Sequence, residues 1–298
     1  MIPSLYRLRT LEIEAELTLA PENPTQASSN SFAAAVKSEK PRPDTLVRAL
    51  FLNGAAMILR AAARSDVGMR RRGNEDRFVL VPEHGFYLVA DGMGGHTAGQ
   101  IASQLAAEAS ARAIAALEGA SVRPAEKLRM VVAAANRAIY LAAQRQPEYA
   151  GMGTTVVAVL AAGERTALAH VGDSRAYLVR RDRIRQLTDD HSIVGELLRR
   201  QEISADAARE HPHRHVLTRA LGVRESVEPD LAELSPSPGD VFVLCSDGLT
   251  NHFEDAELAK LVSDATDLQE ACDDLVDIAN GRGGEDNVTV LLARVETE

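Results

Sequence analysis

Three aspartates lie at the ends of apolar runs, where their carboxylates could meet. Asp91 follows the run Phe86–Ala90 and Asp247 follows Val241–Ser246, and a glycine comes directly after each aspartate. Asp286 instead precedes an apolar run near the C-terminus. If this last run forms a strand antiparallel to the other two, all three carboxylates lie at one rim of a sheet.

Carboxylates gathered at one place repel each other unless a divalent cation lies between them. The pattern therefore predicts a Mg²⁺ or Mn²⁺ site, and such a site suggests phosphate chemistry. An isolated Asp-Gly pair is more often a hairpin turn than a ligand, so the prediction depends on the three aspartates together. The sequence has no cysteine or aspartate nucleophile motif of the phosphatases that form a covalent intermediate. It also has neither a P-loop nor a complete dinucleotide-binding glycine motif.

Alternating strands and helices are expected to position these acids. A hairpin is predicted first, then two alanine-rich helices, four short strands, another strand, two helices and a final strand. The connections among the four short strands are only a few residues long, which indicates antiparallel pairing and an α+β fold. The predicted ranges are 78–81, 86–90, 97–117, 125–144, 154–161, 166–171, 175–180, 184–187, 241–246, 255–262, 267–280 and 288–295.

Composition excludes several classes of partner. The 298 residues carry a net charge of −10, which argues against a nucleic-acid partner because nucleic-acid phosphates require a basic face. The apolar stretch Ala49–Leu59 is too short for a membrane span, and Met1–Ala20 has no signal-peptide core. Only Cys245 and Cys272 are present, as expected for a reducing compartment. We therefore expect a cytoplasmic protein.

Residues 1–60 differ from the rest of the chain because they are polar and rich in proline. They are expected to form a flexible N-terminal extension. A translation start at Met57, which would remove most of this segment, remains an open alternative.

Eight sequence motifs, in order, resemble one family. Together they are similar to the metal-dependent type-2C (PPM) protein serine/threonine phosphatases in their bacterial form. The resemblance covers residues 62–296. The matching stretches are Asp66–Asp76, Val89–His96, Gly151–Thr155, His170–Arg175, Leu187–Ser192, Val216–Gly222, Cys245–Leu249 and Asp286–Thr289.

The resemblance implies an αββα sandwich, in which two antiparallel sheets are flanked by helices. Residues 62–296 would be the catalytic domain, with a flap at about 191–215. The implied reaction is hydrolysis of phosphoserine and phosphothreonine by a water that bridges two divalent metals. The implied partners are phosphoproteins that a Ser/Thr kinase modifies, and the protein is expected to be a monomer.

The resemblance also implies roles for the acidic residues. Asp91 would bridge two ions, and the carbonyl of Gly92 would bind one of them. Asp247 and Asp286 would bind the other ion. Asp173, together with Asp247, would hold a weaker third ion.

Two further acids and one arginine complete the implied site. Glu75 and Asp76 would hold metal-bound waters. Arg71 would bind the substrate phosphate, because it lies five residues before the second acid of the motif, whereas Arg70 and Arg72 are expected to be solvated. The expected catalytic residues are thus Arg71, Asp76, Asp91 and Asp247.

Two further residues and the alternative functions complete the interpretation of the motifs. Met93 stands where eukaryotic relatives have a histidine, so the proton donor to the leaving alcohol is not identified. His191 is interpreted as structural support. The alternatives to an active protein phosphatase are a catalytically weak regulatory module of the same fold and a small-molecule phosphohydrolase.

Overall fold

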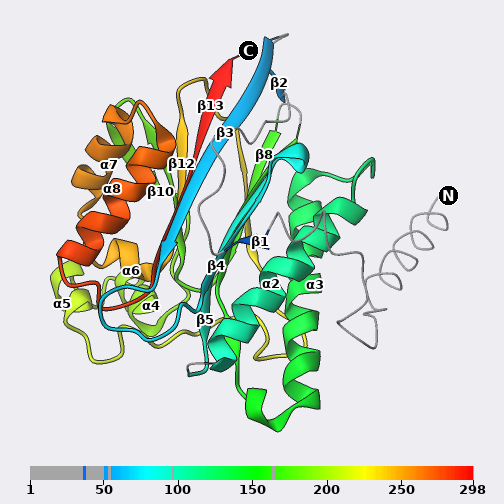
Figure 1. Ribbon diagram of the computed structural model, residues 1–298, viewed down its shortest axis with the longest axis vertical. Helices are drawn as coiled ribbons and strands as arrows, with labels where there is room; N and C mark the ends of the chain where they lie inside the picture. The colour runs from blue at the N-terminus through cyan, green and yellow to red at the C-terminus, as the bar shows by residue number, and fades with distance from the viewer. Residues whose placement is uncertain (1–35, 38–49, 53–54, 96, 163–164, 298) are drawn as a thin grey trace.

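The computed structural model describes residues 36–37, 50–52, 55–95, 97–162 and 165–297. Two antiparallel sheets pack face to face, and helices cover both outer faces (Figure 1). This arrangement confirms the expected αββα sandwich of the α+β class. Among the described helices, none is long and apolar enough to cross a membrane.

The first sheet has seven strands, with β6 beside β5 and off the main order. Its order is β1 (Val36–Lys37), β4 (Asp76–Val81), β5 (Phe86–Met93), β7 (Val156–Ala162), β8 (Arg165–Val171) and β11 (Asp230–Leu234), and β6 is Gly153–Thr154. The second sheet runs β10 (Arg183–Gln186), β9 (Arg175–Arg180), β12 (Val241–Cys245), β13 (Val288–Thr297), β3 (Ala55–Asp66) and β2 (Leu50–Leu52).

Four long helices form the outer layers. The helices α2 (Thr97–Ala116) and α3 (Pro124–Arg145) cover the first sheet, and α7 (Asp255–Asp264) and α8 (Leu268–Gly281) cover the second (Figure 1). Three short helices lie near one end of the sandwich: α4 (Ile193–Arg199), α5 (Ala205–Arg209) and α6 (Asp247–Thr250). Two single 3₁₀ turns, Pro82–His84 and Pro147–Tyr149, complete the described elements.

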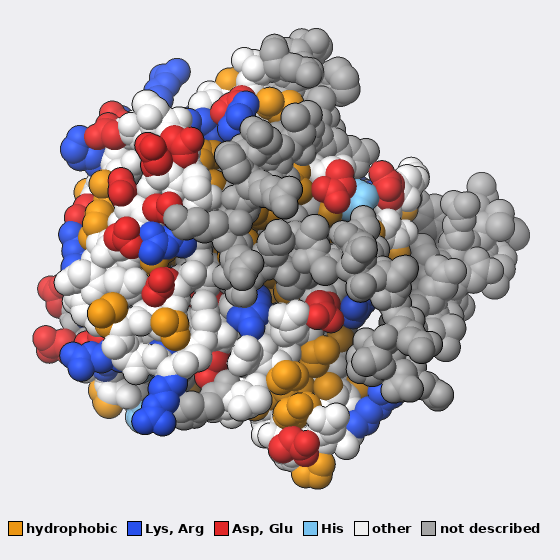
Figure 2. All heavy atoms as spheres, viewed as in Figure 1, with side chains coloured by type: hydrophobic (Ala, Val, Ile, Leu, Met, Phe, Trp, Pro, Cys, Tyr) orange, Lys and Arg blue, Asp and Glu red, His pale blue; other side chains and the backbone are white. Residues whose placement is uncertain are grey.

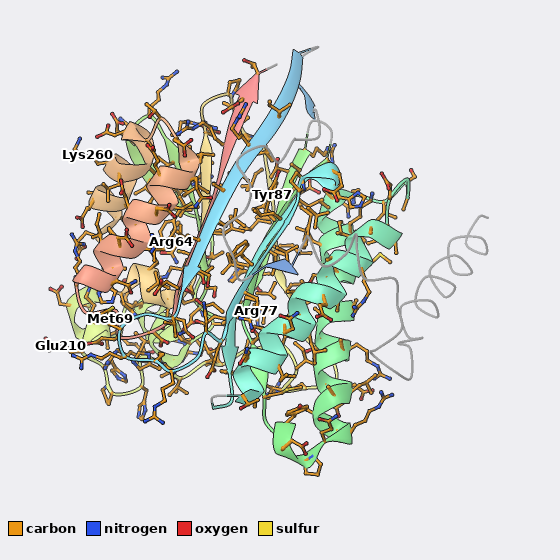
Figure 3. The ribbon with its side chains drawn as sticks, in the orientation of Figure 1. Arg64, Met69, Arg77, Tyr87, Glu210 and Lys260 are labelled. Carbon is orange, nitrogen blue, oxygen red and sulfur yellow. The ribbon has the colours of Figure 1, made fainter. Side chains whose placement is uncertain are left out.

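Three apolar layers hold the four structural layers together. One lies between α2, α3 and the first sheet, one between the two sheets, and one under α7 and α8. The buried face of α2 is built largely from alanines such as Ala102 and Ala106, whose small side chains allow the helix to approach the sheet closely. The Tyr87 hydroxyl in β5 donates a hydrogen bond to the Leu59 carbonyl in β3, 3.2 Å away, across the central layer (Figure 3).

The face seen in Figure 2 carries charges of both signs. Acidic and basic side chains are interspersed over α7 and α8. This mixed pattern differs from the continuous basic surface that is typical of nucleic-acid-binding proteins.

Three details of the fold differ from the sequence-based expectation. The short connection between β8 and β9 does not form a hairpin: β8 lies in the first sheet and β9 in the second, so the connection crosses the sandwich. Strands β1, β2, β3 and β11 were not predicted. The expected domain boundary near residues 60–62 falls inside β3, which begins at Ala55 and pairs with β13 from Met57 to Asp66.

Candidate metal centre

The acidic residues meet at one end of the sandwich, and they come from both sheets. Asp91 lies near the end of β5 in the first sheet, whereas Asp247 follows β12 and Asp286 precedes β13 in the second. The expected antiparallel pairing of β12 with β13 is present, with Cys245 opposite Val290. The expectation of a single sheet rim was wrong, because β5 belongs to the opposite sheet. Figure 1 shows this end beside α4, α5 and α6.

Neither Asp-Gly pair forms a hairpin turn. Asp91 and Gly92 lie within β5, and Asp247 begins α6. Gly92 packs so closely that a Cβ on it would lie 2.1 Å from the Gly99 carbonyl oxygen and 2.8 Å from that of Glu75. Only glycine fits at this position, which is where helix α2 begins to cover the strand.

Asp76 lies opposite Asp91 in the β4–β5 pair and is almost fully buried. The Ser246 hydroxyl donates to Asp76 Oδ2 over 2.8 Å, but Asp76 Oδ1 is buried without a hydrogen-bond partner. Burial raises the pKa of Asp76 to about 7, and the charges of Asp247 and Asp286 also raise it. A buried carboxylate oxygen without a partner is costly, so this atom fits a position that faces a cation or an ordered water.

Mutual repulsion affects the other acids as well. Burial raises the pKa of Asp91 far above its ordinary value and that of Asp173 to about 8, and it also raises the pKa of Asp286. In each case the charge of Asp247 adds to the effect, which puts Asp247 at the centre of the group. A cluster of this kind can ionise fully only if cations neutralise it.

Asp173 reaches the cluster through the connection from β8 to β9. Hydroxyl and backbone hydrogen bonds fix this connection to β5: the Thr155 hydroxyl lies 2.6 Å from that of Ser174 and accepts from the backbone N–H of Asp91 at 3.0 Å. The Thr155 N–H also donates to the Asp91 carbonyl over 2.8 Å. The strand that carries Asp91 is thereby tied to the turn that carries Asp173.

Arg71 is the member of the arginine triplet that reaches the acids. One of its guanidinium nitrogens lies 2.6 Å from Asp286 Oδ2, and its side chain is about half exposed. Arg70 and Arg72 are exposed and form no ion pair within the described part of the chain. Arg71 is thus the arginine of the triplet that lies next to the acids, and its role in phosphate binding stays a prediction.

Asn287 fixes the loop between β3 and β4, which carries Arg71. Its side-chain nitrogen donates to the carbonyls of Val67 at 2.9 Å and Gly73 at 3.0 Å, and its side-chain oxygen accepts from the Glu75 N–H at 2.8 Å. The Glu75 carboxylate packs against Gly99, where a Cβ would lie 2.1 Å from its Oε2. From the sequence, Asn287 was placed in the Asp286–Thr289 motif but given no role, because no sequence pattern reveals contacts with a distant loop.

His215 is a further neighbour of the cluster that sequence reasoning missed. Its Nδ1 lies 3.9 Å from Asp247 Oδ2, and its side chain is 56% exposed. The interaction with the Asp247 carboxylate raises the pKa of His215. The residue lies at the end of the expected flap, so its approach to Asp247 depends on how that segment folds.

The expected flap, residues 191–215, contains α4 and α5. Its two ends meet in what we call the flap neck, where Ser192 and Leu217 form a β-bridge and the Thr218 N–H donates to the His191 carbonyl over 2.8 Å. Away from the flap neck, Arg209 forms an ion pair with Glu254, with a guanidinium nitrogen 2.6 Å from a carboxylate oxygen. In Figure 3, Glu210 of this segment and Met69 of the β3–β4 loop lie at the same end of the molecule.

A second group of ligand-type side chains consists of His170, His191 and Asp230. The Gly172 N–H donates to His191 Nδ1 over 3.0 Å, so His191 Nε2 carries the proton and donates to Asp230 Oδ2 at 3.2 Å. A histidine binds a metal ion through its unprotonated nitrogen and donates a hydrogen bond from the other one. In His191 the unprotonated nitrogen, Nδ1, already accepts from Gly172. The group is therefore better suited to support the Gly172 turn next to Asp173 than to bind an ion.

The sequence and the fold both match known proteins. The family model "Protein phosphatase 2C" matches residues 73–288. The chain is 42% identical over 241 residues to "Serine/threonine phosphatase stp" of Listeria innocua, which covers 78% of this chain and 95% of that protein.

Solved structures give the same result. The crystal structure of the Mycobacterium tuberculosis serine/threonine phosphatase PstP/Ppp has a TM-score of 0.74 and 39% identity, and covers 80% of this chain and 99% of that one. A structure of the PstP catalytic domain in complex with two manganese ions has a TM-score of 0.74 and 37% identity, with coverage of 80% and 99%.

Proposed function

The chain belongs to the protein phosphatase 2C family, and we propose that it is a metal-dependent protein phosphatase that hydrolyses phosphoserine and phosphothreonine. The observation that carries the proposal is the buried group of carboxylates that both sheets contribute to one end of the sandwich. Similar proteins are named as serine/threonine phosphatases, which supports the substrate class.

The donor atoms fit hard divalent cations. Carboxylate and carbonyl oxygens are the ligands that Mg²⁺ and Mn²⁺ prefer, and the unpartnered Asp76 Oδ1 lies among them. We propose that two Mn²⁺ or Mg²⁺ ions bind at the cluster and that a weaker third ion binds near Asp173. The residues proposed to hold the core ions are Asp91, Gly92 through its carbonyl, Asp247 and Asp286, with Asp247 shared with the third ion.

When bound, divalent ions lower the pKa of water and neutralise charge on phosphoryl oxygens. Glu75 and Asp76 orient water at the edge of the cluster in this proposal. The half-exposed Arg71 can reach both the acids and solvent, so its planar fork can bind the phosphate as substrate enters. The catalytic set is then Arg71, Asp76, Asp91 and Asp247.

The proposal extends to partners and compartment. We propose that the substrates are proteins phosphorylated by a Ser/Thr kinase, and that the enzyme acts as a monomer in the cytoplasm. Cys245 and Cys272 are both buried and unpaired, which supports a reducing compartment.

The test is Mn²⁺-dependent release of phosphate from a phosphothreonine peptide. Asp247→Asn keeps the side-chain volume but removes a negative charge from the centre of the cluster. We expect kcat to fall by at least about a hundredfold, as for the loss of a key electrostatic group. Isothermal titration with Mn²⁺ should show weaker binding. Asp264→Asn, at the exposed end of α7, is the matched control and should retain full activity.

A substrate panel separates this function from the alternatives. Preference for nucleotides or sugar phosphates over phosphopeptides would favour a small-molecule phosphohydrolase. Absence of hydrolysis with every phosphoester in saturating Mn²⁺ would favour a regulatory module. Near-normal activity of Asp247→Asn in saturating Mn²⁺ would contradict the assigned site.

A further inference from the structure

A cavity of about 500 Å³ opens at the end of β5, the strand that carries Asp91. Met93, the residue after Gly92, forms part of its wall, and residues between Leu217 and Asp230 form the rest. The carboxylate cluster and the proposed phosphate site do not use this cavity. Its position at the edge of the cluster makes it accessible to the part of a substrate next to the phosphorylated residue.

The wall of the cavity is held in place by the core. Leu221 and Thr154 exchange backbone hydrogen bonds of 2.9 and 3.2 Å, and Thr154 pairs with Gly92 in the adjacent strand. Asn136 of α3 is buried; it accepts from the Gly222 N–H at 2.8 Å and donates to the carbonyl of Arg224 at 3.1 Å. The cavity is thus preformed, so a ligand does not have to order the loop to bind.

One side of the cavity is apolar although it faces solvent. Val223 is 50% exposed, and it is one of three large apolar side chains that are exposed in the described part of the chain. Met93 and Val223 both approach Gly153, where a Cβ would lie 2.7 Å from Met93 Cε and 3.2 Å from Val223 Cγ2. Together they offer an aliphatic surface next to the carboxylate cluster.

The charges of the cavity leave one cation without an ion-pair partner. Arg219 pairs with Asp230 at 2.5 Å, and Glu228 pairs with Arg129. The Arg224 guanidinium forms no ion pair within the part of the chain that the structure describes. The lining therefore combines an aliphatic surface with one uncompensated positive charge.

This combination fits a side chain with an apolar stem and an anionic end. We propose that the cavity binds a glutamate within two positions of the phosphorylated residue of the substrate. Its methylene groups lie against Met93 and Val223, and its carboxylate pairs with Arg224. The inference rests on the proposed phosphatase function and adds a sequence preference to it.

The test compares phosphothreonine peptides that differ only in the flanking residue. Peptides with Glu, Gln or Lys at the two positions on either side are hydrolysed in Mn²⁺, and kcat/KM is measured. We expect the Glu peptide to exceed the Lys peptide by about fivefold to tenfold, the range of a partly exposed ion pair. Arg224→Glu should reverse the order, chiefly through KM, and leave p-nitrophenyl phosphate hydrolysis within about twofold.

Arg183→Glu is the matched control, because Arg183 is exposed in the β9–β10 hairpin at the opposite end of the strands. It should retain the wild-type preference. Equal kcat/KM for the three wild-type peptides would overturn the inference, and so would a preference that Arg224→Glu leaves unchanged. If the wild-type enzyme hydrolyses p-nitrophenyl phosphate but does not distinguish the peptides, only this inference fails. If it hydrolyses neither in Mn²⁺, the phosphatase function fails as well.

Discussion

Arg71 differs from its two neighbours in what its side chain reaches. It lies 2.6 Å from Asp286, whereas Arg70 and Arg72 project from the same loop without a described ion pair. Arg71→Ala should raise KM for a phosphopeptide more than it lowers kcat, because the arginine holds phosphate in both the ground state and the transition state. Steady-state kinetics of the three alanine variants check this. If Arg70→Ala has the largest effect, the register of the motif is wrong.

His191 makes the stability of the fold depend on pH. It is buried, and burial together with the charge of His170 lowers its pKa from 6.5 to about 4. Between these values the unfolded chain binds more protons than the folded one, so stability falls as the pH decreases below 6.5.

His191→Asn removes this titration while its amide oxygen can still accept from Gly172. Urea unfolding at pH 7.5 and pH 5 should show the wild type losing about 2 kcal/mol more than the variant over this range. Comparison with the variant cancels the contribution of the carboxylate cluster, which both proteins share. An equal loss in the two proteins would show that His191 is already solvated in the native state.

At the scale of single residues, those whose side-chain type defines their chemistry could be predicted from the sequence. Asp91, Asp247 and Asp286 were found from their positions at strand ends, and the family resemblance added Arg71. Asn287 and His215 were missed, because their contacts depend on loops that only the folded chain brings together. Residue type and local spacing carry no information about such contacts.

At the scale of the elements, the part of the flap from 199 to 215 is almost entirely exposed, and Ala208 is its one buried residue. The flap neck is fixed by the Ser192–Leu217 bridge, and the charged helices of the flap contact the remainder through pairs such as Arg209 with Glu254. Segments of this kind open locally at low cost. We propose that this flap contributes to the choice of protein substrate and not to the chemical step.

Charge reversal at Arg199 and Arg200 tests the flap. It should change kcat/KM for phosphoproteins while hydrolysis of a small aryl phosphate stays within about threefold, because only transition-state contacts alter the chemistry. Arg112→Glu on α2 is the control for surface charge. Equal effects on both kinds of substrate, or on neither, would identify the segment as a plain solvated helix pair.

The four long helices were predicted to within a few residues, whereas the short helices and the sheet topology were not. Helical spacing is a local signal, so α2, α3, α7 and α8 could be recognised from the sequence. The partners of a strand depend on long-range packing. A short connection indicated a β8–β9 hairpin, but it crosses between the sheets, because Asp173 and its turn are bound to β5 and the flap neck instead.

On the scale of the whole molecule, the position where the folded domain begins decides how much of β3 it contains. β3 pairs with β13 from Met57 to Asp66 and is the fifth of the six strands in the second sheet. A chain that starts at residue 62 lacks half of this ladder, and one that starts at residue 55 retains it. Both lack β1 and β2, so they form a matched pair.

We expect the shorter chain to melt at least about 10 °C below the longer one, or to be insoluble. Thermal unfolding followed by circular dichroism measures the difference. Equal melting temperatures would show that residues 55–61 contribute little to the sandwich.

The origin of the acids in both sheets has a mechanical consequence. In the proposed site, an ion bound by both Asp91 and Asp247 would cross-link the two layers, so its affinity would vary with their separation. The apolar side chains between the sheets, such as Ala63 and Leu244, set that separation without touching the acids. A substitution among them can weaken cation binding at a distance, and cation binding in turn resists shear of the sheets. In this proposal the affinity for the ion depends on the packing between the two sheets as well as on the acids themselves.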